Sequence, residues 1–236
     1  MKGKNLLPFI SDDELYSQVA KVLNVAKAAV STAEENLYSN VVDPFSAVFD
    51  AMRQGVGLTE WLEQEKSRQL QKTLQNALGN FHQEIIGSMD NWESLGDGHV
   101  VDVLSNKLKV IAEIKNKWNT TKGTDQKSIY DNLKTQLKKG EYDSFKAYYV
   151  EVIPKSKGFY DKLFTPSDNV THTKRPKNKN IRKIDGKSFY ALASGDPDAI
   201  DKLYLVLPRV IGDILRISAQ KIEKDSLFKE IFERAY

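Results

Sequence analysis

The stretch VDVLSNKLKVIAEIK, residues 101–115, decides the fold. Two runs rich in β-branched residues, 99–104 and 108–115, flank the short polar segment Ser-Asn-Lys. Two apolar runs joined by a short turn predict a β-hairpin. The turn signal Gly-Asp-Gly just before the first run marks the point where this hairpin begins.

The register of the hairpin decides which side chains meet. Side chains alternate across a strand, so Glu113 and Lys115 share one face. A two-residue loop pairs Ser105 with Leu108 and brings Asp102 to that same face. A three-residue loop without a bulge moves Asp102 to the other face, because a shift of one residue exchanges the two faces of a strand.

This trio has the chemistry needed for phosphodiester hydrolysis. Magnesium is a hard cation that takes oxygen ligands, and one or two carboxylates usually hold it. Asp102 and Glu113 can supply these carboxylates, and the Ile114 carbonyl is a candidate for a further oxygen ligand. Lys115 can orient the attacking water and stabilise phosphate charge. The alternative is a surface strand with an ordinary ion pair between Glu113 and Lys115, which contributes little stability.

The remaining pattern predicts an α/β fold, with a mixed central β-sheet flanked by helices and helical N- and C-terminal parts. We expect one domain over residues 1–236: mainly helical over 1–90, the hairpin, a helix and a strand over 96–154, and a basic loop with C-terminal helices over 155–236. Thr59 is the expected cap of a helix that continues towards Ile86. The other expected elements are helices from Asp12, after Pro44 and over 127–139, strands over 145–153 and 181–184, and helices over 186–193, 197–216 and 218 to the end.

Composition narrows the function classes. Cysteine is absent, so the chain has no disulfide framework and no thiol nucleophile, which fits a cytoplasmic protein. The three histidines are scattered, which argues against a histidine-rich zinc site. The sequence predicts no membrane span and no secretory signal. The net charge is only +3, but residues 174–187 hold seven Lys or Arg residues and a single acid. Such a segment suggests a face for a polyanion, and a plain solvated loop is the equal alternative.

The order Asp102, ten residues, Glu113-Ile114-Lys115 resembles the active-site signature of the PD-(D/E)xK nuclease superfamily. The stretches DPFSAVFDA, EWLEQEKSRQLQKTLQNALGNFHQEIIG, VIAEIKNKWNTTKG, AYYVEVIPK and IRKIDGKSFYALASG are similar to the restriction endonucleases that recognise GGNCC. The resemblance covers about residues 40–195. It implies a restriction-endonuclease-like core, a magnesium-dependent enzyme that cuts unmethylated double-stranded DNA, and a cognate DNA methyltransferase as functional partner.

Carried over residue by residue, Asp102 and Glu113 match the two acids and Lys115 matches the lysine. Val101 stands where the superfamily's nominal motif has proline, a departure that removes no ligand. Many members also carry a supporting Glu or Gln on the helix before the hairpin, a part that Gln83 or Glu84 can play. His82 is a candidate for phosphate contact, although a packed structural histidine is the favoured interpretation.

Specific cutting needs phosphate contacts for position and base-edge contacts for sequence. Guanine presents acceptors in the major groove that suit Arg or Lys. The DNA-contact candidates fall in two segments, one directly after the catalytic strand and one in the basic loop: Lys117, Asn119 and Lys122, then Lys174, Arg175, Lys177, Asn178, Lys179 and Arg182. Because GGNCC is nearly palindromic, we expect a twofold-symmetric homodimer with one half-site per subunit, formed through the C-terminal helices or the amide-rich helix.

Three other functions remain open from the sequence. A repair or recombination nuclease of the same fold would cut with little sequence preference. A non-catalytic DNA-binding protein would bind without cutting, although the intact acids and lysine argue against a decayed site. An ordinary α/β scaffold would carry the same charges as structural ion pairs.

Overall fold

The computed structural model describes residues 5–32, 42–96, 98–121, 123–168 and 173–236. Two compact units emerge: residues 1–19 with 81–236, and residues 20–80. The expectation of a single domain over residues 1–236 stays a prediction. None of the helices in the described part of the chain is both long and apolar enough to cross a membrane.

The larger unit is built on a six-stranded sheet in the order β1-β2-β3-β4-β6-β5. Strands β3, β4 and β6 run parallel, and the other neighbours pair antiparallel, so the sheet is mixed. The strands are β1 (Glu93–Ser94), β2 (Val103–Ser105), β3 (Val110–Lys117), β4 (Lys146–Ile153), β5 (Asp161–Leu163) and β6 (Ile181–Asp185). The predicted α/β class with a mixed, helix-flanked sheet is confirmed.

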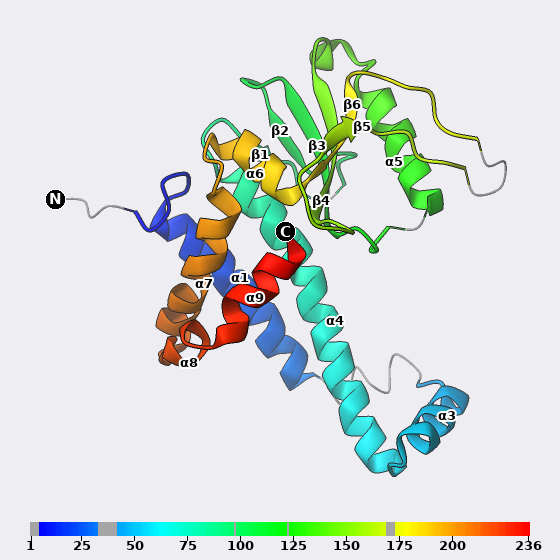
Figure 1. Ribbon diagram of the computed structural model, residues 1–236, viewed down its shortest axis with the longest axis vertical. Helices are drawn as coiled ribbons and strands as arrows, with labels where there is room; N and C mark the ends of the chain where they lie inside the picture. Colours follow the sequence, from blue (N-terminus) through cyan, green and yellow to red (C-terminus); the bar gives the residue numbers. More distant parts are fainter. Residues whose placement is uncertain (1–4, 33–41, 97, 122, 169–172) are drawn as a thin grey trace. The chain divides into compact units, whose positions relative to one another are not determined.

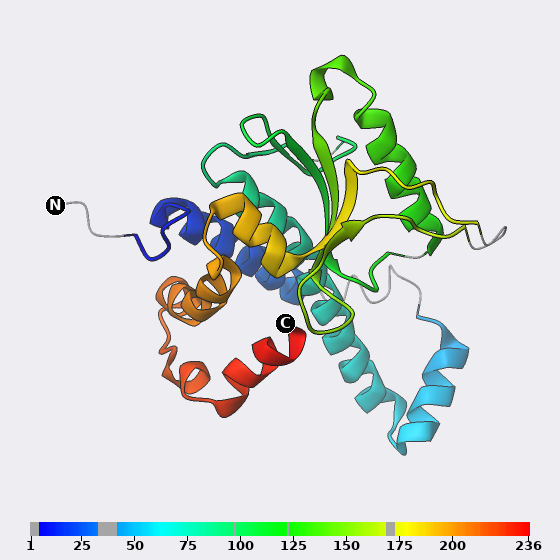
Figure 2. The same cartoon turned by 45° about the horizontal axis from the view of Figure 1, so that its top comes forward.

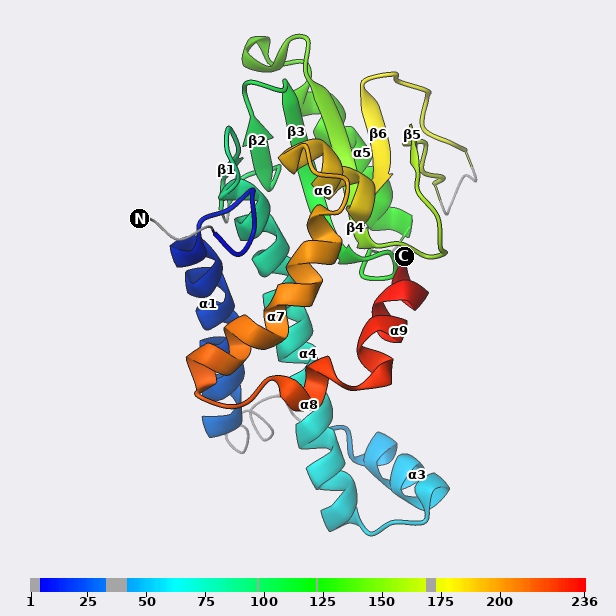
Figure 3. The same cartoon turned by 60° about the vertical axis from the view of Figure 1, so that its left-hand side comes forward.

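Helices cover both faces of this sheet (Figure 1). Helix α5 (Gly123–Gln136) packs Ile129 and Leu133 into a core with Ile111 and Ala147. Helix α6 (Gly186–Ser194) covers the other face, where the Phe189 ring contacts the Tyr148 ring. Figure 3 shows α6 in front of the strands and α5 behind them. The sheet therefore has an α5 face and an α6 face.

The hairpin register is neither of the two that were considered from the sequence. Ser105 pairs with Val110, so the loop holds four residues rather than two, and β2 is only three residues long. The shift relative to the predicted partner, Leu108, is two residues. Because side chains alternate with a period of two, an even shift leaves every side chain on its predicted face. Asp102 therefore precedes β2 on the same face as Glu113, as the two-residue loop had implied.

The helices follow the predicted order, with two differences. The remaining helices of the larger unit are the first part of α1 (Asp12–Ser31), the end of α4 (Leu58–Gly87), α7 (Ala199–Leu215), α8 (Gln220–Glu223) and α9 (Ser226–Ala235), and a 3-10 turn, η1, spans Gly140–Tyr142. The predicted single helix from 218 to the end is wrong, because the helix is interrupted between α8 and α9. There the Asp225 carboxylate caps α9 by accepting from the Leu227 N–H (2.9 Å). Thr59 is not a cap, since α4 already begins at Leu58. Figure 2 shows the orange-to-red C-terminal helices as separate segments.

The smaller unit contains the second part of α1, then α3 (Pro44–Gln54) and then the first part of α4, in chain order. Asp43 caps α3 by accepting from the Phe45 and Ser46 N–H groups, and Pro44 occupies the first turn, where its missing N–H costs nothing. Ala47 and Ala51 bury against Trp61 of α4. Small alanines on α3 allow the indole ring to lie close to the helix.

Candidate active site

Asp102, Glu113 and Lys115 converge on the α5 face of the sheet. Asp102 lies directly before β2, and the ladder pair Val103 and Ala112 places it next to Glu113. Lys115 Nζ lies 2.6 Å from Glu113 Oε1. The Glu113 side chain is 16% exposed and that of Lys115 is 32% exposed, so the pair is half-buried yet reachable from solvent.

Asp102 is held by the backbone of β3. The Ile114 N–H donates to Asp102 Oδ2 over 2.6 Å, and the Asp102 N–H donates to the Ala112 carbonyl over 2.9 Å. Burial, and then the charge of Glu113, raise the pKa of the Asp102 carboxyl to about 6 against the smaller opposing effects of the Ile114 N–H, Lys115 and Gln83. Two carboxylates held this close make the ionised form of Asp102 unfavourable.

Gln83 and Glu84 on α4 have different partners. The Gln83 side chain hydrogen-bonds to the Asp102 carboxyl and acts to lower its pKa. The Glu84 carboxylate instead accepts from the Ser94 hydroxyl over 2.7 Å. Of the two sequence candidates for a supporting residue, Gln83 is the one that the fold brings to Asp102, while its catalytic role stays a prediction.

The pKa of Lys115 reflects opposing influences. Burial alone would lower it, but the charge and hydrogen bond of Glu113, together with Asp102, outweigh burial and raise the pKa. Lys115 is therefore a cation at neutral pH in this arrangement. It is suited to holding a phosphate or orienting a water rather than to removing a proton unaided.

His82 is packed rather than presented to the site. Its Nδ1 lies 2.7 Å from the Tyr190 hydroxyl, and its ring makes edge contacts with Phe81 and Tyr190. Burial lowers the pKa of His82 to about 4. The neutral, enclosed ring matches the favoured sequence interpretation of a structural histidine.

The residues at this site fit a hard divalent cation. Asp102 and Glu113 bring two carboxylates together at the cost of repulsion, which a cation between them would relieve. The Ile114 carbonyl points to the same side of β3 as its N–H, towards Asp102. Among the described residues, no three His, Cys, Asp or Glu side chains cluster as a metal cage. Two carboxylates with room for water are the usual protein contribution to a magnesium site.

The DNA-contact candidates after the catalytic strand are only partly placed. Lys117 ends β3 on the face of Glu113 and Lys115, and Asn119 is exposed in the loop that follows. Lys122 lies outside the described residues. Lys117 lies four residues beyond Glu113 in β3, and the DNA-contact role of Lys117 and Asn119 stays a prediction.

The basic loop before β6 is anchored to α5. Arg175 pairs with Asp131 (2.5 Å), and the Tyr130 hydroxyl donates to the Pro176 carbonyl over 2.6 Å. Asn178 is a turn residue, whose side chain accepts from the Asn180 N–H over 2.9 Å. The three lysines of the loop are exposed: Lys174, Lys177 and Lys179. Of the charged candidates, these lysines are the ones open to a polyanion.

Arg182 is not brought to the catalytic face. It pairs with Tyr148 across the β4–β6 ladder, on the α6 face, and its guanidinium bonds Asp161. The next residue, Lys183, lies on the α5 face and pairs with Glu151. Sequence analysis singled out neither Lys183 nor Glu151, because their place on the face of Glu113 depends on the pairing of β4 with β3 and β6.

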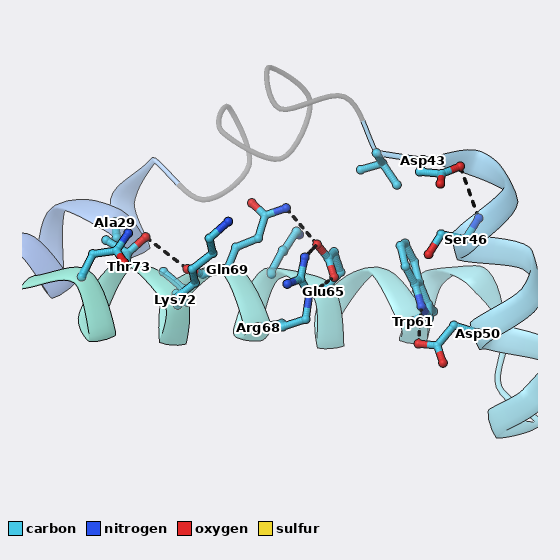
Figure 4. A pocket seen from close by; sticks show the side chains of 14 residues that line it. Ala29, Asp43, Ser46, Asp50, Trp61, Glu65, Arg68, Gln69, Lys72 and Thr73 are labelled. Carbon is cyan, nitrogen blue, oxygen red and sulfur yellow. Dashed lines mark hydrogen bonds and ion pairs between the residues drawn. The ribbon is translucent and has the colours of Figure 1, made fainter. Parts of the chain in front are cut away.

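The smaller unit contains a polar hollow of about 660 Å³ between α3, α4 and the end of α1 (Figure 4). Its wall includes Asp50, which accepts from the Trp61 indole N–H (3.1 Å), and Glu65, which pairs with Arg68 (2.5 Å). None of the predicted catalytic or DNA-contact residues lines it. The chemistry predicted from the sequence therefore belongs to the larger unit.

Comparisons with known proteins show which proteins this chain is similar to. The family model described as Eco47II restriction endonuclease matches residues 7–216. The chain is 40% identical to the type II restriction enzyme Eco47II of Escherichia coli, over 95% of this chain and 97% of that protein. It is 28% identical to the type II restriction enzyme Sau96I of Staphylococcus aureus, over 97% of this chain and 89% of that protein.

Proposed function

Because the chain belongs to the Eco47II restriction endonuclease family and is a type II restriction endonuclease, we propose that it hydrolyses unmethylated double-stranded DNA at GGNCC with magnesium. The recognition site rests on the similarity of its segments to GGNCC-cutting enzymes. The three other interpretations of the sequence are disfavoured, because the relatives Eco47II and Sau96I are both type II restriction enzymes.

The observation that carries the mechanism is the convergence of Asp102, Glu113 and Lys115. Asp102 and Glu113, with the Ile114 carbonyl, would hold the cation. When bound, a divalent cation stabilises charge on the phosphate and lowers the pKa of water. The Ile114 N–H keeps the Asp102 carboxylate oriented, and Gln83 adds a second hydrogen bond to it.

Lys115 acts on the phosphate side of the reaction. In the free protein its ammonium pairs with Glu113. With Glu113 engaged as a metal ligand, the Lys115 ammonium would be released from this pair to contact a phosphate oxygen and orient the attacking water. Charge that develops on the phosphate then meets a fixed cation in a half-buried site, where electrostatic interactions are stronger than in water.

The remaining proposals concern partners. A twofold-symmetric homodimer would place one active site on each strand of a near-palindromic site. A cognate DNA methyltransferase would protect host DNA, and both would act in the cytoplasm. Lys117, Asn119, Lys174, Lys177 and Lys179 are the proposed DNA contacts on the described surface.

The test is to map the ends of the fragments. Mixed-sequence DNA is digested with the full chain and magnesium, and the fragment ends are sequenced, with DNA premethylated at GGNCC as the control. Ends confined to GGNCC and absent from methylated DNA support the proposal. Ends spread over unrelated sequences contradict the specificity, and intact DNA contradicts the activity.

A further inference from the structure

Beyond the catalytic trio, charged side chains continue across the α5 face of the sheet. The register of β3, β4 and β6 sets two rows of side chains on this face, one starting at Glu113 and one at Lys115. Members of a row are neighbours because paired residues on adjacent strands point to the same side. The rows are Glu113, Tyr149 and Lys183, then Lys115, Glu151 and Asp185.

Glu151 is a buried carboxylate in the second row. Its side chain is 2% exposed, its Oε2 accepts from the Tyr160 hydroxyl (2.7 Å), and its Oε1 lies 2.6 Å from Lys183 Nζ. A buried charge is costly unless it is paired. An ion pair of this kind is often no more stabilising than an apolar pair of similar volume, so stability alone does not explain its presence here.

The surroundings hold this pair in place. Asp185 caps α6 by accepting from the Ser188 N–H (2.9 Å) and also accepts from the Tyr160 N–H (2.7 Å). At Gly186 a Cβ would meet the Val152 carbonyl oxygen at 2.2 Å, so only glycine lets the turn from β6 into α6 lie against β4. Tyr160, the second partner of Glu151, is thus tied to the end of β6.

Lys183 faces outward from this cluster. Its side chain is 20% exposed, and its ammonium lies over the Tyr149 ring, 5.4 Å from the ring centroid. That distance is within the limit of about 6 Å for a cation–π contact. Lys183 is two strands from Glu113, roughly 10 Å across the sheet. An ammonium has three N–H donors, so the pairing of Lys183 with Glu151 leaves further N–H groups that can donate to a phosphate.

We propose that Lys183 binds a backbone phosphate of the DNA strand that is paired with the cleaved strand. Glu151 is then the positioning residue that holds the Lys183 ammonium in place. This inference rests on the proposed function. Lys183 shares the face and the row of Glu113, whereas the predicted contact Arg182 lies on the other face and is bound to Asp161. A lysine held by a buried carboxylate loses little conformational freedom when it binds a phosphate.

The test uses matched neutral pairs. Glu151→Gln with Lys183→Met removes both charges, so the net charge of the protein is unchanged. Asp161→Asn with Arg182→Met does the same to the pair on the α6 face and is the control. The affinity of each full-length protein for a duplex with one GGNCC site is measured by fluorescence anisotropy, without divalent metal, at several salt concentrations.

One lost phosphate contact lowers the magnitude of the slope of log affinity against log salt by about 0.9. We expect this loss in the Glu151–Lys183 pair variant, the wild-type slope in the control, and the wild-type slope in Lys183→Arg, which keeps the cation. An unchanged slope in the Glu151–Lys183 variant, or an equal loss in the control, overturns the inference.

Two further results separate the possible failures. If the Glu151–Lys183 variant does not fold by circular dichroism, Lys183→Gln replaces it, because the amide still donates to Glu151, and the same loss of slope is expected. If the wild type itself does not bind the duplex, the proposed function fails together with the inference. Wild-type binding with an unchanged slope in the variant overturns only the role of Lys183.

Discussion

The backbone N–H of Ile114 donates a 2.6 Å hydrogen bond to the carboxylate of Asp102. Ile114 is the residue between Glu113 and Lys115, so this single bond ties the first acid of the motif to the peptide that carries the second acid and the lysine. Together with the Asp102 N–H bond to the Ala112 carbonyl, this contact holds Asp102 beside the strand that carries Glu113 and Lys115.

Asp102→Asn should make the metal-free protein more stable at neutral pH. The pKa of Asp102 is raised to about 6, so the folded protein binds this proton between about pH 4 and 6 while the unfolded chain does not. The contribution of Asp102 to stability is thus present at low pH and is lost as pH rises through 6. Asparagine carries no charge, so we expect a gain of about 1–3 kcal/mol at pH 7, measured by urea unfolding with chelator present.

To control for other titrating groups, the free energy of unfolding of the wild type is subtracted from that of Asp102→Asn at each pH. Buried His82 has a lowered pKa and contributes the opposite dependence, but it is present in both proteins and cancels. A stability difference that is flat from pH 4 to 7 would contradict the raised pKa of Asp102. Asp102→Ala should lack the gain, because it leaves the Ile114 N–H without its partner.

Divalent-metal affinity should fall as pH drops through about 6. A cation needs the ionised carboxylate, and below the pKa of Asp102 each pH unit costs about tenfold in affinity. Isothermal titration with magnesium or manganese between pH 5 and 8 measures this dependence. Affinity that stays constant over this range would mean that Asp102 is not a ligand, and Asp102→Asn should bind metal weakly at every pH.

Gln83→Ala should slow cleavage, and Glu84→Ala should not. Gln83 hydrogen-bonds to Asp102, whereas Glu84 bonds the Ser94 hydroxyl. Residues that orient a metal ligand typically change metal affinity or activity by about 10–100-fold. Single-turnover cleavage rates of both variants at saturating DNA make the comparison. Equal cleavage rates for the two variants would contradict a catalytic role of Gln83.

Lys177→Ala with Lys179→Ala should weaken DNA binding in a salt-dependent way. Both lysines are exposed in the loop that Arg175 and Tyr130 anchor to α5. Two lost phosphate contacts would reduce the salt slope by about 1.8. Lys138 and Lys139, both exposed just after α5, offer a matched removal of two charges outside the loop. The loop is not a DNA contact if Lys138→Ala with Lys139→Ala changes the slope as much as the loop variant does.

Sequence analysis left the face of Asp102 open between two hairpin registers, and the observed register places Asp102 on the face of Glu113. The loop of four residues shifts Ser105 by two positions, and periodicity of two preserves the face. Face assignment needs only the parity of the register, whereas the loop length depends on backbone geometry, including the left-handed conformation of Lys109 (φ 55°).

The contacts across the sheet could not be predicted in the same way. Arg182 and Lys183 are adjacent cations in one basic segment, and charge patterning does not tell them apart. Their faces follow from the pairing of β6 with β4, a long-range contact that a local pattern does not contain. The choice of Gln83 over Glu84 likewise depends on where α4 ends against the hairpin, since both residues lie within the same turn of helix.

The most direct test of the central claim compares cleavage by the wild type, Asp102→Ala and Lys115→Ala on one plasmid with magnesium, with DNA binding measured in parallel. The proposed site predicts discrete fragments from the wild type only, while both variants still bind the plasmid. Cleavage that survives both substitutions would mean that the hairpin carrying Asp102, Glu113 and Lys115 is not the active site.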